Sequence, residues 1–342
     1  MATTSMHDVA RHAGVSVGTV SNVLNRPDIV ASATCKRVLD AIDQLGFVRN
    51  ESARQLRAGR SRVVALVVLD IANPFFADVA RGAEAAAEEN GSLVMLCGSG
   101  EDAERERRSL EQLEELRVRG VLITPTGHNH AQLERLRRRS IPVILVDHHS
   151  RTGQHCSTAV DDVLGGRLAG EHLLAQGHHR IGFVGGPFTL RQVTDRHQGL
   201  TAALTRHTVA APQVFQTPNL TVTAGRAAGA ELASLPAERR PTAVFCGNDL
   251  LALGVLAETT SRGLRVPQDL ALIGYDDIDF AATAAVPLSS VRQPRERLGR
   301  AAAELLLLEE TETPHQHRQL VFEPELVVRQ SSSVPAPGST AR

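Results

Sequence analysis

Seven short apolar runs alternate with amphipathic stretches along most of this chain, and this alternation restricts the possible fold more than any other feature. The runs are VVALVVLD, SLVMLC, GVLIT, PVILVD, RIGFVGG, TAVFCG and DLALIGYDD, beginning at Val63. Continuous apolar strands separated by helices are typical of parallel sheets covered by helices on both faces. Because seven units exceed one ordinary sheet, the pattern predicts an α/β core of two doubly wound lobes with a cleft between them.

The ends of these strands are where a ligand is expected, since open α/β sheets bind ligands outside the carboxyl ends of their strands. The polar residues at or just after strand ends are Asp70, Asn73, Asp147, Gly185, Asn248 and Asp276. After the last of these strands the chain continues through PLSSVRQPRERLGRAAAELLLL and LVFEPELVVR. The Ser-, Pro- and Gly-rich segment 331–342 is expected to be a disordered tail.

The first sixty residues follow a different pattern, in which VARHAGVSVGTVSNVLN predicts a helix, a tight turn and a second helix. Gly14 supplies the positive-φ residue that ends the first helix. Ser16 can cap the second helix by accepting a hydrogen bond from a backbone N–H near Thr19. Helix-turn-helix proteins place the outward face of such a second helix in the major groove of DNA. The alternative is a helical hairpin of some other small domain.

The segment SATCKRVLDAIDQLGF, which begins at Ser32, predicts a third helix that completes a small all-α domain. Basic residues outnumber acidic ones in the first sixty residues, although the whole chain has a net charge of -1. These basic residues are Arg11, Arg26, Lys36, Arg37, Arg49, Arg54, Arg57 and Arg60. Such a local excess is the electrostatic pattern expected of a domain that contacts DNA phosphates.

The next segment, NESARQLRAGRSR, can form a helix of about two turns between Asn50 and Gly59, which is marginal alone in water. Leu56 lies beside Arg54 and Arg57, and an exposed leucine in that setting suits a wedge into the minor groove. A solvated linker whose leucine packs on the next domain fits the composition equally well.

Several other classes of protein and site are disfavoured. Cys35, Cys97, Cys156 and Cys246 are scattered, so we expect reduced thiols, with no disulfide framework or zinc site. No segment has the length of a membrane span or the apolar region of a signal peptide, which predicts a soluble cytoplasmic protein. We expect no cofactor, and no enzyme activity, because no nucleophile–base or metal constellation is present.

Paired histidines are the one sequence feature that suggests a metal. They are His128 with His130, His148 with His149, and His178 with His179. No third or fourth ligand follows at a standard spacing. We therefore interpret them as surface residues.

Eight motifs, in the same order along the chain, resemble the LacI/GalR family of bacterial transcription regulators. They are DVARHAGVSVGTVSNVLN, RVLDAIDQLGF, NESARQLRAGRS, ANPFFADVARGAE, DDVLGGRLAGEHL, IGFVGG, GNDLLALGV and IGYDDI. The resemblance implies an N-terminal all-α helix-turn-helix headpiece over residues 1–49, a hinge helix over 50–60 and a periplasmic-binding-protein-like core over 61–330. Within the core, lobe 1 is expected at about 61–158 and 292–330, and lobe 2 at about 159–291.

The resemblance also implies a repressor whose affinity for DNA is controlled by a small molecule. The expected partners are a second copy of the chain, a near-palindromic double-stranded operator and an effector between the lobes, with a sugar or sugar derivative as the expected effector. The residues implied to contact DNA are Val17, Gly18, Thr19, Ser21, Asn22, Asn25, Ala53, Leu56 and Arg57. Those implied to contact the effector are Phe76, Asp147, Arg196, Leu220, Asn248, Asp276 and Gln293.

Two positions depart from what direct recognition would favour. Gly18 offers no side chain to a base and Val17 offers only methyl groups, so base contacts depend on Asn22, which can pair bidentately with adenine. We hypothesise that specificity comes more from the hinge and from DNA shape; alternatively, Gly18 only lets the backbone approach DNA closely.

In the expected effector cleft, Leu220 stands where the family often has an aromatic residue. Asp276, whose alternative role is capping a nearby turn, remains the main candidate to grip the effector.

The core alone would also permit a solute-binding protein of a sugar transport system. The basic headpiece and the lack of a signal peptide oppose that alternative. An α/β enzyme is the third class considered. Neither alternative explains residues 6–59.

Overall fold

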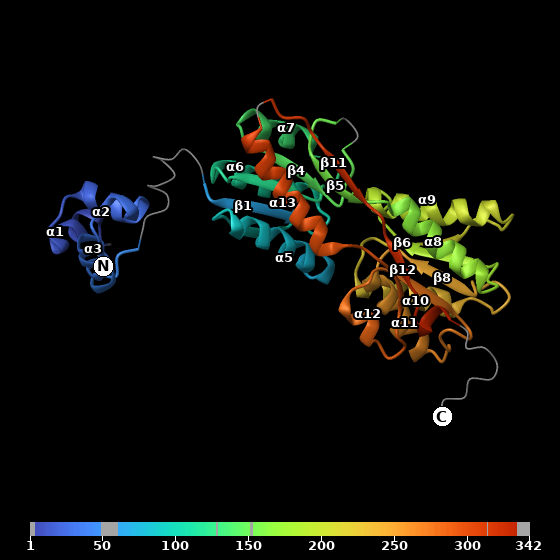
Figure 1. The fold of residues 1–342 in the computed structure, drawn as a ribbon. Helices are drawn as coiled ribbons and strands as arrows, with labels where there is room; N and C mark the ends of the chain where they lie inside the picture. Colours follow the sequence, from blue (N-terminus) through green and yellow to red (C-terminus); the bar gives the residue numbers. More distant parts are fainter. Residues whose placement is uncertain (1–3, 49–60, 128, 151–152, 313, 334–342) are drawn as a thin grey trace. The chain divides into compact units, whose positions relative to one another are not determined.

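The computed structural model describes residues 4–48, 61–127, 129–150, 153–312 and 314–333 of the chain. The chain forms two compact units, residues 1–60 and 61–342, and each is described by itself. Figure 1 colours the small helical unit blue and the larger α/β unit from cyan to red.

The described part of the N-terminal unit, residues 4–48, contains a bundle of three helices. They are α1 (Met6–Ala13), α2 (Val17–Asn25) and α3 (Ser32–Gln44), with a 3₁₀ turn at Pro27–Ile29. Val9, Val20 and Val38, one from each helix, are fully buried at its centre. The predicted helix-turn-helix is confirmed in this bundle: Gly14 has φ 63°, and Ser16 Oγ accepts a hydrogen bond from the Thr19 N–H at 3.1 Å.

The larger unit contains two six-stranded sheets, which confirms the predicted two-lobed α/β architecture. Lobe 1 has strand order β11-β5-β4-β3-β1-β2, and lobe 2 has strand order β12-β10-β9-β8-β6-β7. Every pairing is parallel except that of β10 with β12. The central strands are buried on both faces, as their continuous apolar sequences predict.

The elements of lobe 1 are β1 (Val63–Val68), α5 (Pro74–Glu89), β2 (Leu93–Gly98), α6 (Ala103–Glu115), β3 (Gly120–Ile123), α7 (His130–Arg138), β4 (Val143–Val146), β5 (Ser157–Val160), α13 (Arg295–Thr311) and β11 (Gln319–Phe322). Those of lobe 2 are α8 (Asp162–Ala175), β6 (Ile181–Gly185), α9 (Arg191–Arg206), β7 (Gln213–Gln216), α10 (Val222–Ser234), β8 (Ala243–Cys246), α11 (Asp249–Ser261), β9 (Ala271–Asp276), α12 (Asp279–Thr283), β10 (Ser289–Arg292), β12 (Glu325–Val327) and a 3₁₀ turn, η2 (Gln330–Ser332).

Three helix pairs pack at glycines. In α8 and α9, a Cβ on Gly166 would collide with the backbone carbonyl of Arg196, and a Cβ on Gly199 would collide with that of Val163. Reciprocal glycines of the same kind join α5 to α13 and α10 to α11. Only glycine allows backbones to approach this closely, so these positions set the spacing of the helices that cover both sheets.

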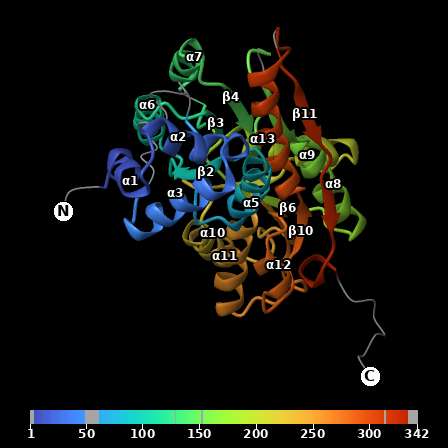
Figure 2. The ribbon, with the colours of Figure 1, turned by 60° about the vertical axis from the view of Figure 1, so that its left-hand side comes forward.

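The C-terminal part of the predicted domain boundaries is wrong. The chain crosses between the lobes after β5, after β10 and again after β11, so that β12 and η2 belong to lobe 2 rather than lobe 1. The red C-terminal segment can be followed from one lobe to the other in Figures 1 and 2. Because β12 is only three residues long and begins three residues after β11 ends, no helix or separate apolar run marks the third crossing.

The predicted start of the tail at residue 331 is also wrong. Ser331 and Ser332 are fully buried. Ser331 Oγ donates to the Leu272 carbonyl at 2.6 Å and accepts from the Ser289 N–H at 2.8 Å. Composition suggested a tail because serine is common in disordered segments, but here the hydroxyls satisfy backbone groups at the edge of the sheet. Residues 334–342 lie outside the described residues.

Candidate functional site

The outward face of α2 carries the residues predicted to contact DNA. Gly18, Asn22 and Asn25 are exposed, whereas Val17, Thr19 and Ser21 are half-buried. Asn25 Nδ2 donates to the Ser21 carbonyl at 2.8 Å. Within the described residues the Asn22 side chain makes no hydrogen bond, so its amide is available to a base edge. The predicted contacts Ala53, Leu56 and Arg57 lie outside the described residues.

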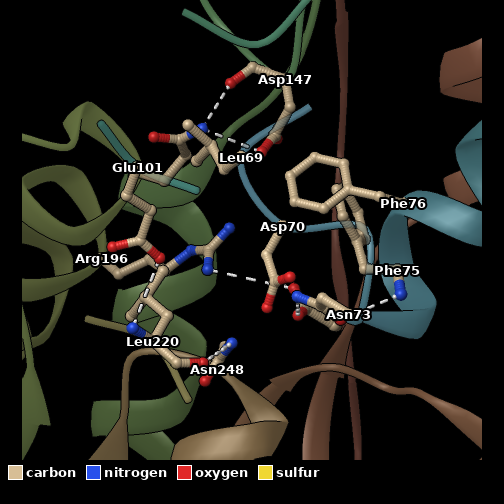
Figure 3. A pocket seen from close by; sticks show the side chains of 12 residues that line it. Leu69, Asp70, Asn73, Phe75, Phe76, Glu101, Asp147, Arg196, Leu220 and Asn248 are labelled. Carbon is tan, nitrogen blue, oxygen red and sulfur yellow. Dashed lines mark hydrogen bonds and ion pairs between the residues drawn. The ribbon is translucent and has the colours of Figure 1, made fainter. Parts of the chain in front are cut away.

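A cleft within the larger unit gathers most of the predicted effector residues. Its lining comes from the carboxyl ends of strands in both lobes and from the first turns of α9, where the topology of doubly wound sheets places ligands. Figure 3 shows these side chains pointing toward one another. The lining residues are Leu69, Asp70, Asn73, Phe75, Phe76, Glu101, Asp147, Gln192, Arg196, Leu220, Asn248 and Asp276.

Arg196 is the buried cation of the cleft. Its Nε donates to Asp162 Oδ1 at 2.8 Å and its Nη1 donates to the Gly247 carbonyl at 2.7 Å. The guanidinium lies 3.7 Å from the centre of the Tyr275 ring. These contacts hold the guanidinium plane in one orientation, because a planar fork with two hydrogen bonds and a stacked face has little remaining freedom.

Asp276 faces Arg196 across the cleft floor, with Arg196 Nη1 4.0 Å from Asp276 Oδ1. Gln293 Nε2 donates to the same oxygen at 2.7 Å, so Gln293 supports Asp276 although it does not line the cleft itself. Asn73 Nδ2, from lobe 1, lies 3.5 Å from Asp276 Oδ2. Burial raises the pKa of Asp276 to about 6, against the lowering effect of Arg196 and Gln293.

Asp147 supplies a carboxylate from lobe 1. Gln192 Nε2, from lobe 2, donates to both the Asp147 backbone carbonyl and its Oδ2 at 3.0 Å. Asp147 Oδ1 is buried and has no hydrogen-bond partner within the described residues. Burial and the nearby Asp162 raise the pKa of Asp147 to about 8. A ligand hydroxyl would therefore find a polar atom that the protein leaves unsatisfied, and it can accept a hydrogen bond from the protonated acid or donate one to the carboxylate.

Three of the cleft carboxylates stand on unusual backbone. Glu101, Asp147 and Asp276 have φ values of 61°, 52° and 107°, which lie in the region that normally favours glycine. Such positions cost of order 1–3 kcal/mol each and cluster at ligand-binding sites. The strain turns these carboxylates toward the cleft at the ends of strands or in the turn before α6.

The remaining predicted residues form the walls of the cleft. Asn248 caps α11 by accepting from the Leu251 N–H at 2.9 Å, while its Nδ2 donates to the Leu220 carbonyl at 3.1 Å. Phe75 and Phe76 stack edge to face, 4.9 Å apart. Leu220 is the only residue of this group from the loop before α10, and its N–H lies 3.4 Å from Glu101 Oε1.

Gln192, Glu101 and Asp162 are the residues that sequence reasoning missed. Gln192 lies four residues before Arg196, so it shares the same face of α9 and could have been found by helical spacing. Glu101 follows Gly100 in the turn between β2 and α6, three residues beyond the end of the strand. Asp162 sits in the first turn of α8 and could be linked to Arg196 only through the fold.

The expectation that the paired histidines are surface residues is only partly right. His130 and His179 are exposed, but His148, His149 and His178 are half-buried. Burial lowers the pKa of His148 to about 4. His178 Nδ1 lies 3.0 Å from Thr242 Oγ1.

Comparisons with known proteins now bear on these sites. Residues 5–50 match the family described as bacterial regulatory proteins, lacI family, and residues 171–332 match the periplasmic binding protein-like domain. The ribose operon repressor of Escherichia coli (strain K12) is 34% identical over 330 residues, covering 96% of this chain and 99% of the relative. The chain belongs to the lacI family.

Two solved structures of this family are similar to the chain as a whole. A transcriptional regulator CelR–cellobiose complex has a TM-score of 0.72 and 32% identity, covering 96% of this chain and 99% of that one. The lac repressor dimer bound to operator and the anti-inducer ONPF has a TM-score of 0.84 and 25% identity, covering 97% and 100%.

Membership of this family makes the chain a DNA-binding transcriptional regulator and removes the alternative of a transport solute-binding protein. The lacI match covers α1 to α3, the unit that a transport protein would not carry. A search of the described helices finds none that is both long and apolar enough to span a membrane.

Proposed function

We propose that this chain is a transcriptional repressor that binds a near-palindromic operator as a homodimer, through α2 of each headpiece, and that a neutral sugar bound between the lobes controls its affinity for DNA. The observation that carries the effector part is a buried cleft in which Arg196 and Asp276 of lobe 2 face Asp147 of lobe 1. Hydroxyl groups both donate and accept, so a polyol satisfies carboxylates and a guanidinium together.

The charge of the cleft favours a neutral effector. Its lining holds four carboxyl side chains, Asp70, Glu101, Asp147 and Asp276, against the single guanidinium of Arg196. Burial raises the pKa of Asp147 to about 8 and that of Glu101 to about 7, so protons neutralise part of this charge near neutral pH. Arg196 is already paired with Asp162 and faces Asp276, so a phosphorylated or carboxylated ligand would find no unpaired cation among the lining side chains.

The walls of the cleft favour a compact ligand. Phe76 supplies one apolar face against which a sugar ring can pack, and Leu220 supplies the opposite wall where an aromatic residue would narrow the space. The cavity volume of the cleft is about 30 Å³. Since ligand pockets are several hundred Å³, the lobes must separate to admit a sugar and then close on it.

This movement is the basis of the allosteric mechanism. A ligand that contacts Asp147 and Phe76 on lobe 1 and Arg196, Asn248 and Asp276 on lobe 2 binds one arrangement of the lobes better than another. Only that difference in affinity can shift the equilibrium between the arrangements. The shift then changes how the two headpieces and hinges of a dimer meet the operator.

On the DNA side, we assign the base contacts to Val17, Gly18 and Asn22, and the phosphate contacts to Thr19, Ser21 and Asn25. Asn22 is the one side chain of this group able to make a bidentate pair with adenine. By resemblance, Ala53, Leu56 and Arg57 contact the minor groove, with Leu56 as the wedge. The protein acts in the cytoplasm, catalyses no reaction and uses no cofactor.

The test is operator binding at fixed salt, with DNA from upstream of the native gene, in the presence and absence of pentoses, hexoses, disaccharides and their phosphates. We expect one neutral sugar to change affinity at least tenfold, about 1.4 kcal/mol of coupling, and its phosphate to have no effect. A shift by the phosphate alone would refute the charge argument. Specific binding that no compound alters would refute the effector site, and absence of specific binding would refute the proposal as a whole.

A further inference from the structure

Four possible metal ligands meet in lobe 1, away from the effector cleft. They are the Cys156 thiol, the Glu309 carboxylate and the His315 and His317 imidazoles, and one ligand atom from each lies within 4.8 Å of every other. Cys156 precedes β5, Glu309 lies in the last turns of α13, and the two histidines lie between α13 and β11. The cleft is built at the carboxyl ends of the strands, whereas this group, the Cys156 cluster, lies at the amino end of β5.

The distances within the Cys156 cluster suit a tetrahedral ion. Cys156 Sγ is 3.1 Å from His315 Nε2 and 3.8 Å from His317 Nδ1. One Glu309 oxygen, Oε2, lies 4.0 Å from His315 Nε2 and 3.9 Å from His317 Nδ1. Tetrahedral zinc with bonds of about 2.0–2.3 Å places neighbouring ligand atoms about 3.3–3.8 Å apart, so small movements of the side chains bring all four into the coordination sphere.

One atom of the cluster, Glu309 Oε2, is left without a hydrogen bond within the described residues. It is buried and faces both imidazoles. Buried polar atoms are nearly always satisfied, and a binding site for an ion is one of the standard reasons for an exception. The group is largely shielded from solvent: the Cys156 residue is fully buried, and the side chains of His315, Glu309 and His317 are 9%, 14% and 21% exposed. Closed sites with four protein ligands are typical of structural zinc.

The surroundings orient the ligands as they do in known metal sites. His315 Nδ1 lies 3.2 Å from Glu312 Oε2, so the ring can donate there while Nε2 faces the cluster. Arg318 Nη2 donates to the other oxygen of Glu312 at 2.6 Å and holds that carboxylate in place. The Arg318 backbone N–H lies 3.3 Å from Cys156 Sγ and stabilises a thiolate. A carboxylate–histidine–metal relay of this kind fixes the tautomer and raises the basicity of the ligand.

We propose that the Cys156 cluster binds one Zn²⁺ ion through Cys156 Sγ, Glu309 Oε2, His315 Nε2 and His317 Nδ1. The set combines a soft thiolate, two imidazoles and one carboxylate, which matches zinc and disfavours the oxygen-seeking Mg²⁺ and Ca²⁺. The ion ties the end of α13 to the paired strands β5 and β11. Sequence reasoning predicted no zinc site because Cys156 and His315 are 159 residues apart and share no motif.

The test begins with the full-length protein, stripped of metal by a chelator and titrated with Co²⁺ as a spectroscopic probe. We expect one equivalent to give the intense visible bands of tetrahedral cobalt together with a thiolate-to-cobalt charge-transfer band, and Zn²⁺ to bleach both. Zn²⁺ should also raise the thermal unfolding midpoint, because it binds the folded state only. The weak bands of octahedral cobalt, or no charge-transfer band, would overturn the site.

Variants identify the ligands by Zn²⁺ competition against a chromophoric chelator. Cys156→Ser and His315→Gln should each lower zinc affinity by at least about 100-fold, and Glu312→Gln, which affects only the orientation of His315, by about 10–100-fold. Cys97→Ser and His207→Gln, outside the cluster, are the matched controls and should bind as the original protein does. Equal zinc affinity in Cys156→Ser and the original chain would refute the assignment. Should Cys156→Ser fail to fold, His315→Gln and the cobalt spectrum of the original protein decide the question.

Discussion

Replacing Gly166 by alanine should disturb effector binding from a position that does not line the cleft. Gly166 lies in α8, opposite the backbone of Arg196 in α9. A Cβ added there would lie 2.8 Å from the Arg196 carbonyl carbon and 3.0 Å from the Leu200 backbone nitrogen, and closer still to the Arg196 carbonyl oxygen. These are backbone atoms, so no side-chain rotation can relieve the collision.

The magnitude follows from how the two helices must respond. Close glycine packing places helix axes near the lower end of the usual 8–10 Å separation, and the added methyl group forces α9 outward. Overpacking of this kind costs about 1–3 kcal/mol. The same movement carries the Arg196 guanidinium away from Asp162 and Gly247. A hydrogen bond to a charged group contributes about 1.5–3 kcal/mol. Losing half of that free energy lowers the affinity for the effector by about three- to tenfold.

The assay pairs urea unfolding with effector titration in solution. Gly82→Ala is the matched control, because Gly82 in α5 makes the same backbone contact, with Glu296 of α13, but in lobe 1. We expect both variants to lose stability and only Gly166→Ala to lose this much effector affinity. The reasoning fails if Gly166→Ala keeps both its stability and its affinity, or if Gly82→Ala weakens the effector equally.

Four further predictions concern the cleft and the DNA-binding face of α2. Asp276→Asn keeps the shape of the cleft but removes a charged acceptor. The free energy of effector binding should therefore weaken by about 1.5–3 kcal/mol, roughly 10- to 150-fold in affinity, as measured by calorimetry. An unchanged affinity would leave Asp276 with only a turn-capping role. On the DNA side, Gly18→Ala should stabilise the headpiece by up to about 1 kcal/mol, and it should weaken operator binding if the backbone approaches DNA closely at Gly18. Asn22→Ala should reduce discrimination at a single adenine by about 1–3 kcal/mol, measured in competition assays with substituted operators. Equal loss of affinity at every base pair would contradict the Asn22 assignment. Burial raises the pKa of Asp147 from 3.8 to about 8, so between these pH values the folded protein holds a proton there that the unfolded chain has lost. This group's contribution to stability therefore decreases as pH rises from about 4 to about 8. The urea midpoint of the original chain should fall relative to that of Asp147→Asn across this window, and a rise of the original chain's midpoint relative to the variant's would refute the sign.

The headpiece could be predicted almost residue by residue, because its determinants are local. Gly14 ends α1 with a positive φ, Ser16 caps α2 through a residue three positions away, and the apolar positions repeat at helical spacing. Each of these signals lies within one turn of the structure that it specifies. The fold of the core was accessible for a related reason, since its buried strands carry continuous apolar runs.

The parts that could not be predicted depend on contacts between distant segments. β7 is a polar edge strand, with sequence QVFQ, and β12 is three residues long and begins three residues after β11 ends, so neither stands out as a separate apolar run. Ser331 is buried only because β10 and β9 present backbone groups to it. In the cleft, strand-end position identified Asp147 and Asp276, but the pairing of Arg196 with Asp162 requires the packing of α9 on α8.

The cleft explains how a small ligand can influence the arrangement of two lobes that already touch. Gln192 of lobe 2 donates to Asp147 of lobe 1, and Asn73 of lobe 1 approaches Asp276 of lobe 2. A sugar that enters must replace these contacts with hydrogen bonds from its own hydroxyls. The free energy by which it shifts the lobe arrangement is therefore the difference between the two sets of hydrogen bonds rather than their sum. Because Asp147 Oδ1 lines the cleft and is buried and unsatisfied within the described residues, a hydroxyl-rich ligand gains there a partner that the protein alone does not supply, and this gain is one source of the difference in affinity between the two arrangements.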